Sequence, residues 1–328
     1  MNINTFSYEN LVNRCTLVIG NSGSGKTYLI REMLFKLKDK IPNCVLFSPT
    51  NEQNEDFKGI IPSAAVISNL DGGRLVKKLQ RIFKRQEEQV AVYNKVNDLA
   101  VLQVLARKLS VQDEVVDGLR DLLAEYESTK TELLNQDPPP HNLDELLSNI
   151  DKDRDRANEK LVHAYKDAIA AAYKDQKYSK DIQFSSEHHQ LAKSLRINPN
   201  IMLILDDMAA FFDASVQKAD VIRKVAFQGR HAHITTIISL QSDKTLIPAL
   251  RSQAHFIAFT ETNCLEGFSK ANSIFCPKSA KQVADTMRLN KEDHIKTIYD
   301  KSADRFFYVR AMNKLPFRFG CDVFWQFC

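Results

Sequence analysis

An eight-residue segment near the amino terminus constrains this chain more than any other feature. The segment consists of Gly20, Asn21, Ser22, Gly23, Ser24, Gly25, Lys26 and Thr27, and it matches the pattern G-x-x-x-x-G-K-[ST]. It lies directly between the apolar run at residues 15–19 and a predicted helix that begins at Lys26. A strand–loop–helix context of this kind lets the loop surround a phosphate group with its backbone N–H groups.

The residue types in this P-loop indicate which ligand it binds. Glycines allow a tight turn at the positive end of a helix dipole, where a phosphate is stabilised. In such loops the lysine, here Lys26, reaches the β- and γ-phosphates of a nucleoside triphosphate, and the hydroxyl of Thr27 binds Mg²⁺. We therefore predict that ATP and Mg²⁺ are the cofactors and that all eight loop residues contact them.

A P-loop also needs an acid that holds the magnesium ion, at the end of a neighbouring buried strand. Residues 201–205 read I-M-L-I-L, and Asp206 and Asp207 follow them directly. We predict that Asp206 holds Mg²⁺, mostly through a water, and that Asp207 orients and deprotonates the water that attacks the γ-phosphate. The alternative is a strand that simply enters a turn, where consecutive aspartates are common.

A third polar position follows another apolar run, residues 234–240. A polar side chain at the tip of a strand between the P-loop strand and the acid strand can contact both the γ-phosphate and the water. We predict Gln241 as this sensor, with Ser239 and Ser242 as weaker candidates. A loop glutamine without a role is the alternative.

Two arginines and a group of bases have two readings each. Arg230 and Arg251 flank the run 234–240, and either could reach the ATP of a neighbouring subunit as an arginine finger or serve as a surface ion-pair residue. Six bases occur within twelve residues that contain no acid, namely Arg74, Lys77, Lys78, Arg81, Lys84 and Arg85. They could contact DNA phosphates or form an ordinary solvated helix face.

The periodicity divides the chain into three zones. Residues 1–73 and 198–328 alternate apolar strands with helices, as at residues 26–38 and 220–227, whereas residues 74–197 are helical in pattern. We therefore predict an α/β fold with a parallel central sheet and a long all-helical insertion, a bundle or coiled-coil arm, at residues 74–197. Residues 305–310 and 317–323 are predicted to form a terminal antiparallel hairpin.

Composition excludes some classes of protein. The longest apolar runs are far shorter than the roughly 18–20 residues that cross a bilayer, so we expect no membrane partner. The six cysteines form no C-x-x-C pair, and the first residues lack an export signal. We therefore expect an intracellular protein, in the cytoplasm or nucleus. The net charge of +4 permits DNA binding without demonstrating it.

Four segments together resemble a known family. They read G-N-S-G-S-G-K-T, then I-L-D-D, then F-Q-G-R-H-A-H-I-T-T-I-I-S-L-Q, and finally I-P-A-L-R-S-Q-A-H-F-I-A-F. This succession resembles the poxvirus-type genome-packaging ATPases of the FtsK–HerA superfamily, which also occur in other large DNA viruses and in virus-like transposons. The match covers residues 12–70 and 200–260. The G-R-H before a strand that ends in L-Q is more specific than the P-loop.

The resemblance implies a RecA-like sheet, a homo-oligomeric ring and the translocation of double-stranded DNA into a capsid, with a capsid or portal protein as a further partner. If the chain is viral, it would lie in the host cytoplasm or nucleus or be associated with the virion. By motif position, Asp207 would be the catalytic carboxylate, Gln241 the sensor, and Arg251 the trans-acting arginine, with Arg230 second. The wider superfamily often has Glu where this chain has Asp207. The helical zone has no counterpart in the family, and it could serve capsid docking, ring assembly or DNA guidance.

Three other functions would use the same P-loop. A helicase or a remodelling or repair ATPase would need the same P-loop and acids, so only substrate assays would separate it from a packaging motor. A small-molecule kinase would need an arginine-bearing lid and an acceptor site, which the sequence does not show. A nucleotide-gated scaffold would need Lys26 and would tolerate the loss of Asp207.

Overall fold

The structure is a computed structural model that describes residues 6–50, 55–111, 114–176, 184–208, 216, 219–242, 244, 246–271, 280–289, 295–311 and 316–326. The chain divides into two compact units. One unit consists of Met1–Glu88 together with Asn198–Cys328, and the other consists of Gln89–Ile197. We call them the sheet unit and the helical unit. Among the described residues, no helix is both long and apolar enough to span a membrane.

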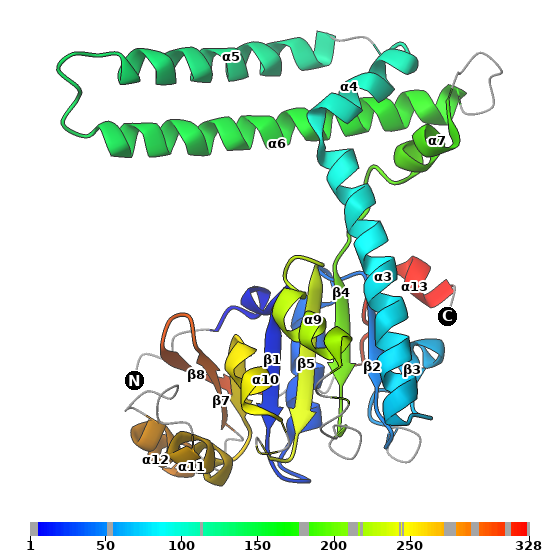
Figure 1. The fold of residues 1–328 in the computed structure, drawn as a ribbon, viewed down its shortest axis with the longest axis vertical. Coiled ribbons are helices and arrows are strands. Elements are labelled where there is room, and N and C mark those ends of the chain that lie inside the picture. Colours follow the sequence, from blue (N-terminus) through cyan, green and yellow to red (C-terminus); the bar gives the residue numbers. More distant parts are fainter. Residues whose placement is uncertain are drawn as a thin grey trace. The chain divides into compact units, whose positions relative to one another are not determined.

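The sheet unit is built on an eight-stranded sheet with the order β3-β2-β4-β5-β1-β6-β7-β8 (Figure 1). The strands are β1 (Cys15–Ile19), β2 (Asn43–Phe47), β3 (Val66–Ile67), β4 (Ile201–Leu205), β5 (Ile234–Leu240), β6 (Phe256–Phe259), β7 (Ile295–Asp300) and β8 (Arg305–Arg310). The first six strands of this order are parallel, and β7 and β8 are antiparallel at one edge. Because β5 separates β1 from β4, the P-loop strand and the acid strand are not direct neighbours.

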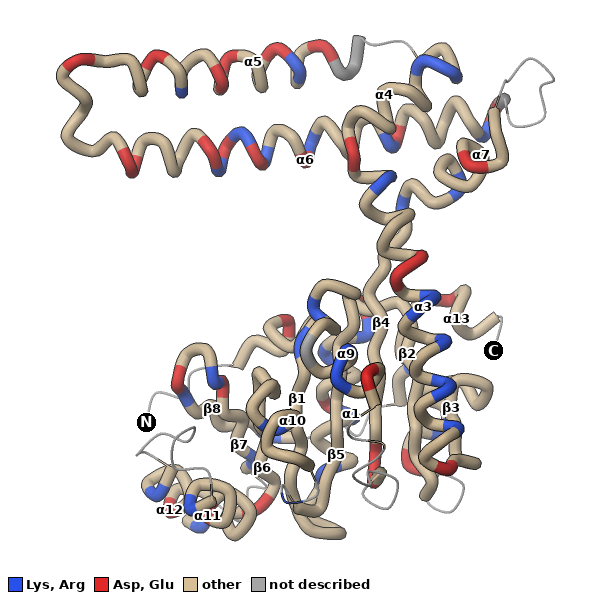
Figure 2. Tube along the Cα trace, viewed as in Figure 1, with Lys and Arg blue, Asp and Glu red and all other residues tan. Residues whose placement is uncertain are grey.

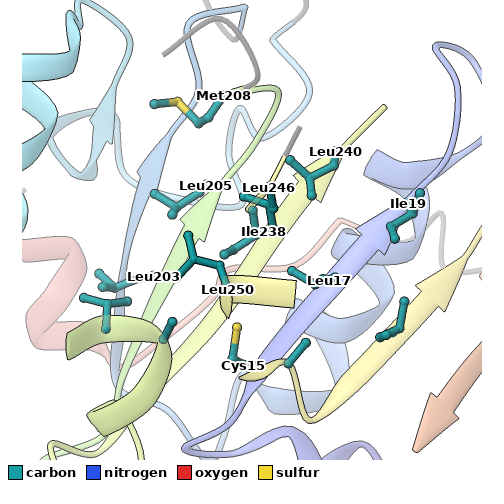
Figure 3. Packing of buried hydrophobic residues seen from close by; sticks show 14 of the residues in the cluster. Cys15, Leu17, Ile19, Leu203, Leu205, Met208, Ile238, Leu240, Leu246 and Leu250 are labelled. Atoms are coloured by element: carbon teal, nitrogen blue, oxygen red, sulfur yellow. The ribbon is translucent and has the colours of Figure 1, made fainter. Parts of the chain in front are cut away.

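Helices cover both faces of the sheet, because alternate residues of each strand point to opposite faces. On one face, Leu203 and Leu205 of β4 belong to the same apolar cluster as residues of helices α9 (Asp220–Gln228), α10 (Pro248–Gln253), α11 (Thr262–Ala271) and α12 (Ala280–Leu289). Figure 3 shows this packing, with Leu246 and Leu250 next to β1, β4 and β5.

The other face of the sheet is covered mainly by α1 (Lys26–Leu37) and by the short 3-10 helix η1 (Tyr8–Leu11). Met202 and Ile204 of β4 point to this face, and residues of α1 such as Met33 are fully buried there. The chain closes this face near its end, where Phe319 is fully buried just before α13 (Asp322–Gln326). The sheet is therefore the middle of three layers.

The helical unit contains the end of α3 (Gly72–Asn97) and helices α4 (Leu99–Lys108), α5 (Glu114–Leu134), α6 (Leu143–Gln176) and α7 (Ser186–Lys193). Helices α5 and α6 lie antiparallel (Figure 1), on either side of a segment that contains Pro138, Pro139 and Pro140. The unit has its own apolar core, in which Leu105, Leu161 and Leu191 are buried. Ion pairs also join α5 to α6, such as Lys130–Asp151 at 2.7 Å.

The helical unit and the predicted helical insertion do not begin at the same residue. The helical unit covers Gln89–Ile197, and the predicted insertion covers residues 74–197. The first turns of α3 belong to the sheet unit because Leu75, Leu79 and Phe83 are buried in its core. A helical period alone does not tell which core a helix packs against.

The predicted terminal hairpin is partly wrong. Strand β8 matches the predicted residues 305–310, but its antiparallel partner is β7 and not residues 317–323. The turn after β7 is stabilised by Asp300, whose side chain accepts hydrogen bonds from the backbone N–H of Ser302 and from its hydroxyl, at 2.9 and 2.6 Å. Residues 317–321 form no strand, and α13 follows them.

The predicted fold class is confirmed. The chain has an α/β fold with a mostly parallel central sheet, and its long helices are inserted between β3 and β4.

Candidate functional site

The P-loop connects the end of β1 to the start of α1. Gly25 precedes α1 in the left-handed region at φ 89°, a conformation that glycine adopts without strain. Gly20 has a different reason to be glycine, because a Cβ atom there would lie 1.8 Å from the hydroxyl oxygen of Thr260. The amino end of α1 therefore faces the loop interior with its first N–H groups unpaired within the helix, as an anion site requires.

Predicted site residues that follow three different strands meet at one cavity. The carboxyl ends of parallel strands lie at the same edge of a sheet, so the residues after β1, β4 and β5 come together there. The cavity has a volume of about 400 Å³. Its lining residues are Ser22, Gly23, Gly25, Lys26, Thr27, Tyr28, Thr50, Asp56, Asp206, Asp207 and Gln241.

Among the described residues, no carboxylate lies within hydrogen-bonding distance of the Lys26 ammonium group. Its Nζ donates to the backbone carbonyl oxygens of Gly20 and Asn21, at 2.8 Å each. Burial lowers the pKa of Lys26, while the carboxylates of Asp207 and Asp206 act in the opposite direction. The ammonium group is thus held at the mouth of the loop by neutral partners, which an anionic phosphate can replace.

Asp206 is buried at the end of β4, with 6% of its surface exposed. Its backbone N–H donates to the carbonyl oxygen of Phe47 at 2.8 Å, which continues the β2–β4 pairing, and the hydroxyl of Ser48 donates to its Oδ2 at 3.4 Å. Burial raises the pKa of Asp206; the hydroxyl of Ser239 lowers it, and the Asp207 carboxylate raises it.

The backbone changes direction at Asp207, directly after Asp206, and Asp207 lines the edge of the cavity. Its φ of 51° is unusual for a residue other than glycine, and such left-handed residues are concentrated at functional sites. The side-chain amide of Gln241 donates from its Nε2 to Oδ1 of Asp207 at 3.1 Å. The predicted sensor and the predicted catalytic carboxylate are therefore in direct contact.

The donor set of this cavity fits a magnesium ion. Mg²⁺ prefers oxygen ligands and is usually held by one or two protein groups together with substrate phosphates and waters. The carboxylate of Asp206 and the hydroxyl of Thr27 line the same cavity and are of this type. Among the described residues, no group of three or more His, Cys, Asp or Glu side chains could hold a metal by itself. The fit is therefore to a magnesium ion that arrives with a nucleotide.

The predicted arginines lie away from this cavity. Arg230 precedes β5 and Arg251 lies in α10, which precedes β6. Both residues therefore come before a parallel strand, at its amino end, whereas the P-loop follows the carboxyl end of β1. In agreement, Arg230 lies near His255, just before β6. Burial lowers the pKa of His255 most, and the positive charges of Arg14, Lys301 and Arg230 lower it further. Neither arginine lines the cavity of its own chain, so an action on a neighbouring subunit stays a prediction.

Three residues that the sequence did not indicate also hold the P-loop. Thr260 and Glu261 follow β6 directly, and they contact the loop through Ser24 Oγ at 2.6 Å and Asn21 Nδ2 at 2.6 Å, respectively. The third residue is Lys296 of β7. The rule that the carboxyl ends of parallel strands meet could have indicated the first two, because β6 is a direct neighbour of β1.

Lys296 is a buried lysine whose hydrogen-bond acceptors are carbonyl groups. It is 9% exposed, and its Nζ donates to the carbonyl oxygens of Ser24 and Thr260, at 2.6 and 3.1 Å. Burial lowers the pKa of Lys296, while the carboxylate of Glu261 acts in the opposite direction. The antiparallel strand β7 thus contributes a second lysine to the P-loop.

A second cavity of about 630 Å³ lies on the β6 and β7 side of the P-loop. It shares Gly23 with the first cavity. Its lining is rich in amide, hydroxyl and charged groups, from Asn21, Ser24, Thr260, Glu261, Thr262, Asn263, Arg288 and Lys296, and Met287 and Ile295 also line it. The loop therefore separates two polar cavities.

Comparison with known families identifies the family of this chain. The family model described as "Helicase HerA, central domain" matches residues 5–246, which contain the P-loop, both aspartates and Gln241. The chain belongs to this HerA family. The resemblance to the FtsK–HerA superfamily is thereby confirmed, and the chain is a P-loop NTPase of that superfamily.

Relatives of this HerA-family chain come from a virus. Protein B354L of African swine fever virus is 22% identical over 343 residues, which cover 98% of this chain and 89% of the relative. Among solved structures, the genome packaging NTPase B204 from Sulfolobus turreted icosahedral virus 2, in complex with ATP-gammaS, is 16% identical, with a TM-score of 0.38, over 90% of this chain and 96% of that one. The solved structure of the plasmid coupling protein TrwB is 11% identical, with a TM-score of 0.32. This match covers 95% of this chain and 82% of TrwB.

Proposed function

We propose that this HerA-family chain hydrolyses ATP with Mg²⁺ to move double-stranded DNA, and that its task is to package a viral genome into a capsid. The contact between Gln241 and Asp207, 3.1 Å apart at the edge of the P-loop cavity, is the observation that carries the hydrolase part. The four sequence segments that resemble the packaging ATPases, together with a relative from a virus, support the packaging part.

Each site residue has a role that follows from its position. Lys26 would bind the β- and γ-phosphates, and Thr27 and Asp206 would hold Mg²⁺, which neutralises charge on the phosphates when bound. Asp207 would accept the proton of the water that attacks the γ-phosphate, and Gln241 would orient that water. The nucleoside would extend from the P-loop into the second cavity, which offers amide and hydroxyl groups for hydrogen bonds.

The proposed motor is a homo-oligomeric ring. Arg251, or else Arg230, would stabilise the transferring phosphoryl group of a neighbouring subunit, because neither lines the cavity of its own chain. A capsid or portal protein would be the further partner, and the helical unit is the part of the chain that would contact it, assemble the ring or guide DNA.

A helicase is the second candidate, and the description of the matched family favours it. Strand separation and duplex translocation would use the same nucleotide site, so the site geometry does not choose between them. Unwinding of a labelled duplex distinguishes a helicase from a motor that moves along intact duplex.

The test of the proposed hydrolase is the steady-state ATPase rate with and without double-stranded DNA. We expect DNA to stimulate the wild-type rate. Asp207→Asn removes the proton acceptor, so turnover should fall on the order of 100-fold or more while ATP binding is retained. A hydrolysis rate that DNA does not change would contradict the proposal that DNA is the substrate. An Asp207→Asn rate equal to that of the wild type would contradict the assignment of Asp207 as the catalytic carboxylate.

A further inference from the structure

The first turns of α3 carry a concentrated positive charge. Residues 74–85 contain six bases and no acid, and all six side chains are exposed. Figure 2 shows them as a series of blue segments along the part of α3 that belongs to the sheet unit. We call Arg74, Lys77, Lys78, Arg81, Lys84 and Arg85 the basic face of α3.

These bases lie on one side of the helix. With 3.6 residues per turn, the six positions fall within an arc of about 120°. Leu75, Leu79 and Phe83 lie on the opposite side and are buried in the core of the sheet unit. Their packing fixes the rotation of α3, so the basic face is held towards solvent and does not depend on a flexible segment.

The charges of this face are largely unneutralised. Arg74 forms an ion pair with Asp71 at 3.2 Å, whereas the other five bases pair with no carboxylate in the part of the chain that the structure describes. An ordinary solvated helix interleaves charges of both signs, as in α6, where Arg156 pairs with Asp153 at 2.9 Å. A run of unpaired bases instead creates a positive potential that attracts a polyanion.

We propose that the basic face of α3 binds the phosphate backbone of double-stranded DNA. The inference rests on the proposed function for the identity of the substrate, and it adds the surface that contacts it. Six bases spread over about 16 Å of helix can contact several phosphates, since each DNA strand carries one charge per roughly 3.4 Å of axis. A protein partner fits less well, because the apolar residues among these bases, such as Val76 and Ile82, are partly buried against the core and provide no exposed anchor.

The test compares two variants of the full chain that lose equal charge. The face variant carries Lys77→Gln, Lys78→Gln, Arg81→Gln and Arg85→Gln. The control variant changes four bases of the sheet unit that already pair with acids, at 2.8 to 3.8 Å, and carries Lys36→Gln, Lys38→Gln, Lys40→Gln and Lys58→Gln. A third variant exchanges Lys and Arg within the face and keeps its charge.

Binding of a fluorescein-labelled duplex of arbitrary sequence is measured by anisotropy between 50 and 200 mM salt. We expect the face variant to bind at least about tenfold more weakly, and the slope of log K against log salt to shrink by about 0.9 for each phosphate that the protein no longer neutralises. The control and charge-keeping variants should bind like the wild type. Unchanged melting temperatures and an unchanged ATPase rate without DNA show that the variants are folded.

Three results would overturn the assignment: equal binding by the face variant and the wild type, an equally weakened control, or wild-type binding to phosphatidylserine vesicles but not to duplex. The outcome for the proposed motor is separate. If the wild-type chain binds duplex through this face but hydrolyses no ATP, the result would support DNA binding by the basic face and contradict the proposed motor function. If DNA stimulates hydrolysis and the face variant binds duplex as well as the wild type, the result would support the motor function and contradict DNA binding by the basic face.

Discussion

Lys26 and Lys296 both place an ammonium group against the backbone of the P-loop, and they come from different parts of the fold. Lys26 is the first residue of α1, whereas Lys296 comes from the antiparallel edge of the sheet. Buried lysines are rare unless they are paired, and the partners here are the carbonyl oxygens of Ser24 and Thr260. Lys296 therefore acts as a positioning residue, which fixes the loop and adds positive charge beside it.

Replacing Lys296 should weaken nucleotide binding. Lys296→Met keeps most of the side-chain stem and leaves two carbonyl groups without their donor, a loss of about 1–3 kcal/mol. We expect the dissociation constant for a non-hydrolysable ATP analogue, measured by calorimetry, to rise by about tenfold or more, and KM to change more than kcat. Lys281→Met, at an exposed position of α12, is the matched control. If the Lys296→Met variant binds the analogue with the affinity of the wild type, Lys296 does not contribute to nucleotide binding.

At the scale of elements, α3 has two tasks along its first turns. Its apolar side closes the core of the sheet unit, and its opposite side carries the basic face. Leu79 lies in this core with none of its surface exposed, between the bases at positions 78 and 81. The stability of the sheet unit and the presentation of the basic face therefore depend on the same packing.

Truncating Leu79 tests this packing. Leu79→Ala should lower the free energy of unfolding of the sheet unit by about 2–5 kcal/mol, because it leaves a cavity in a closed core. Gln80→Ala, at an exposed neighbouring position, should change it by no more than about 0.5 kcal/mol. Urea unfolding followed by the fluorescence of Trp325, the single tryptophan and a residue of this unit, provides the measurement. Equal transitions for the two variants would contradict this account of α3.

The site residues that sequence patterns locate are those that directly follow a recognisable strand. The P-loop, Asp206 and Gln241 each follow an apolar strand, so the rule for parallel strands places them at one edge. The sequence does not indicate Lys296, because β7 alternates less clearly, as I-K-T-I-Y-D, and residues 317–323 offer a competing partner for β8. Nor does it indicate Asp56, which lies in a loop without a motif although it lines the same cavity.

At the scale of the whole molecule, the helical unit is an insertion whose two connections to the sheet unit lie close together. The side-chain amide of Gln86 in α3 donates a hydrogen bond to the carbonyl oxygen of Pro199, just before β4. Each unit also has its own apolar core. The sheet unit therefore has the features of a part that folds without the insertion.

Replacing Gln89–Ile197 by a short Gly-Ser linker tests this independence. We expect the shortened chain to keep the Trp325 fluorescence of the folded sheet unit and to bind the ATP analogue with the affinity of the full chain. The linker can be short because Gln86 and Pro199 are in contact. A shortened chain that is unfolded, or that no longer binds nucleotide, would show that the sheet unit needs the helical unit.

Movement along intact duplex is the central claim, and displacement of a third strand measures it most directly. A labelled triplex-forming oligonucleotide is placed on linear double-stranded DNA, and its release is followed with the full chain and ATP. We predict release that requires hydrolysis, so a non-hydrolysable analogue or Asp207→Asn should abolish it while the two duplex strands stay paired. Robust ATP hydrolysis on this DNA without any release of the third strand would contradict the claim.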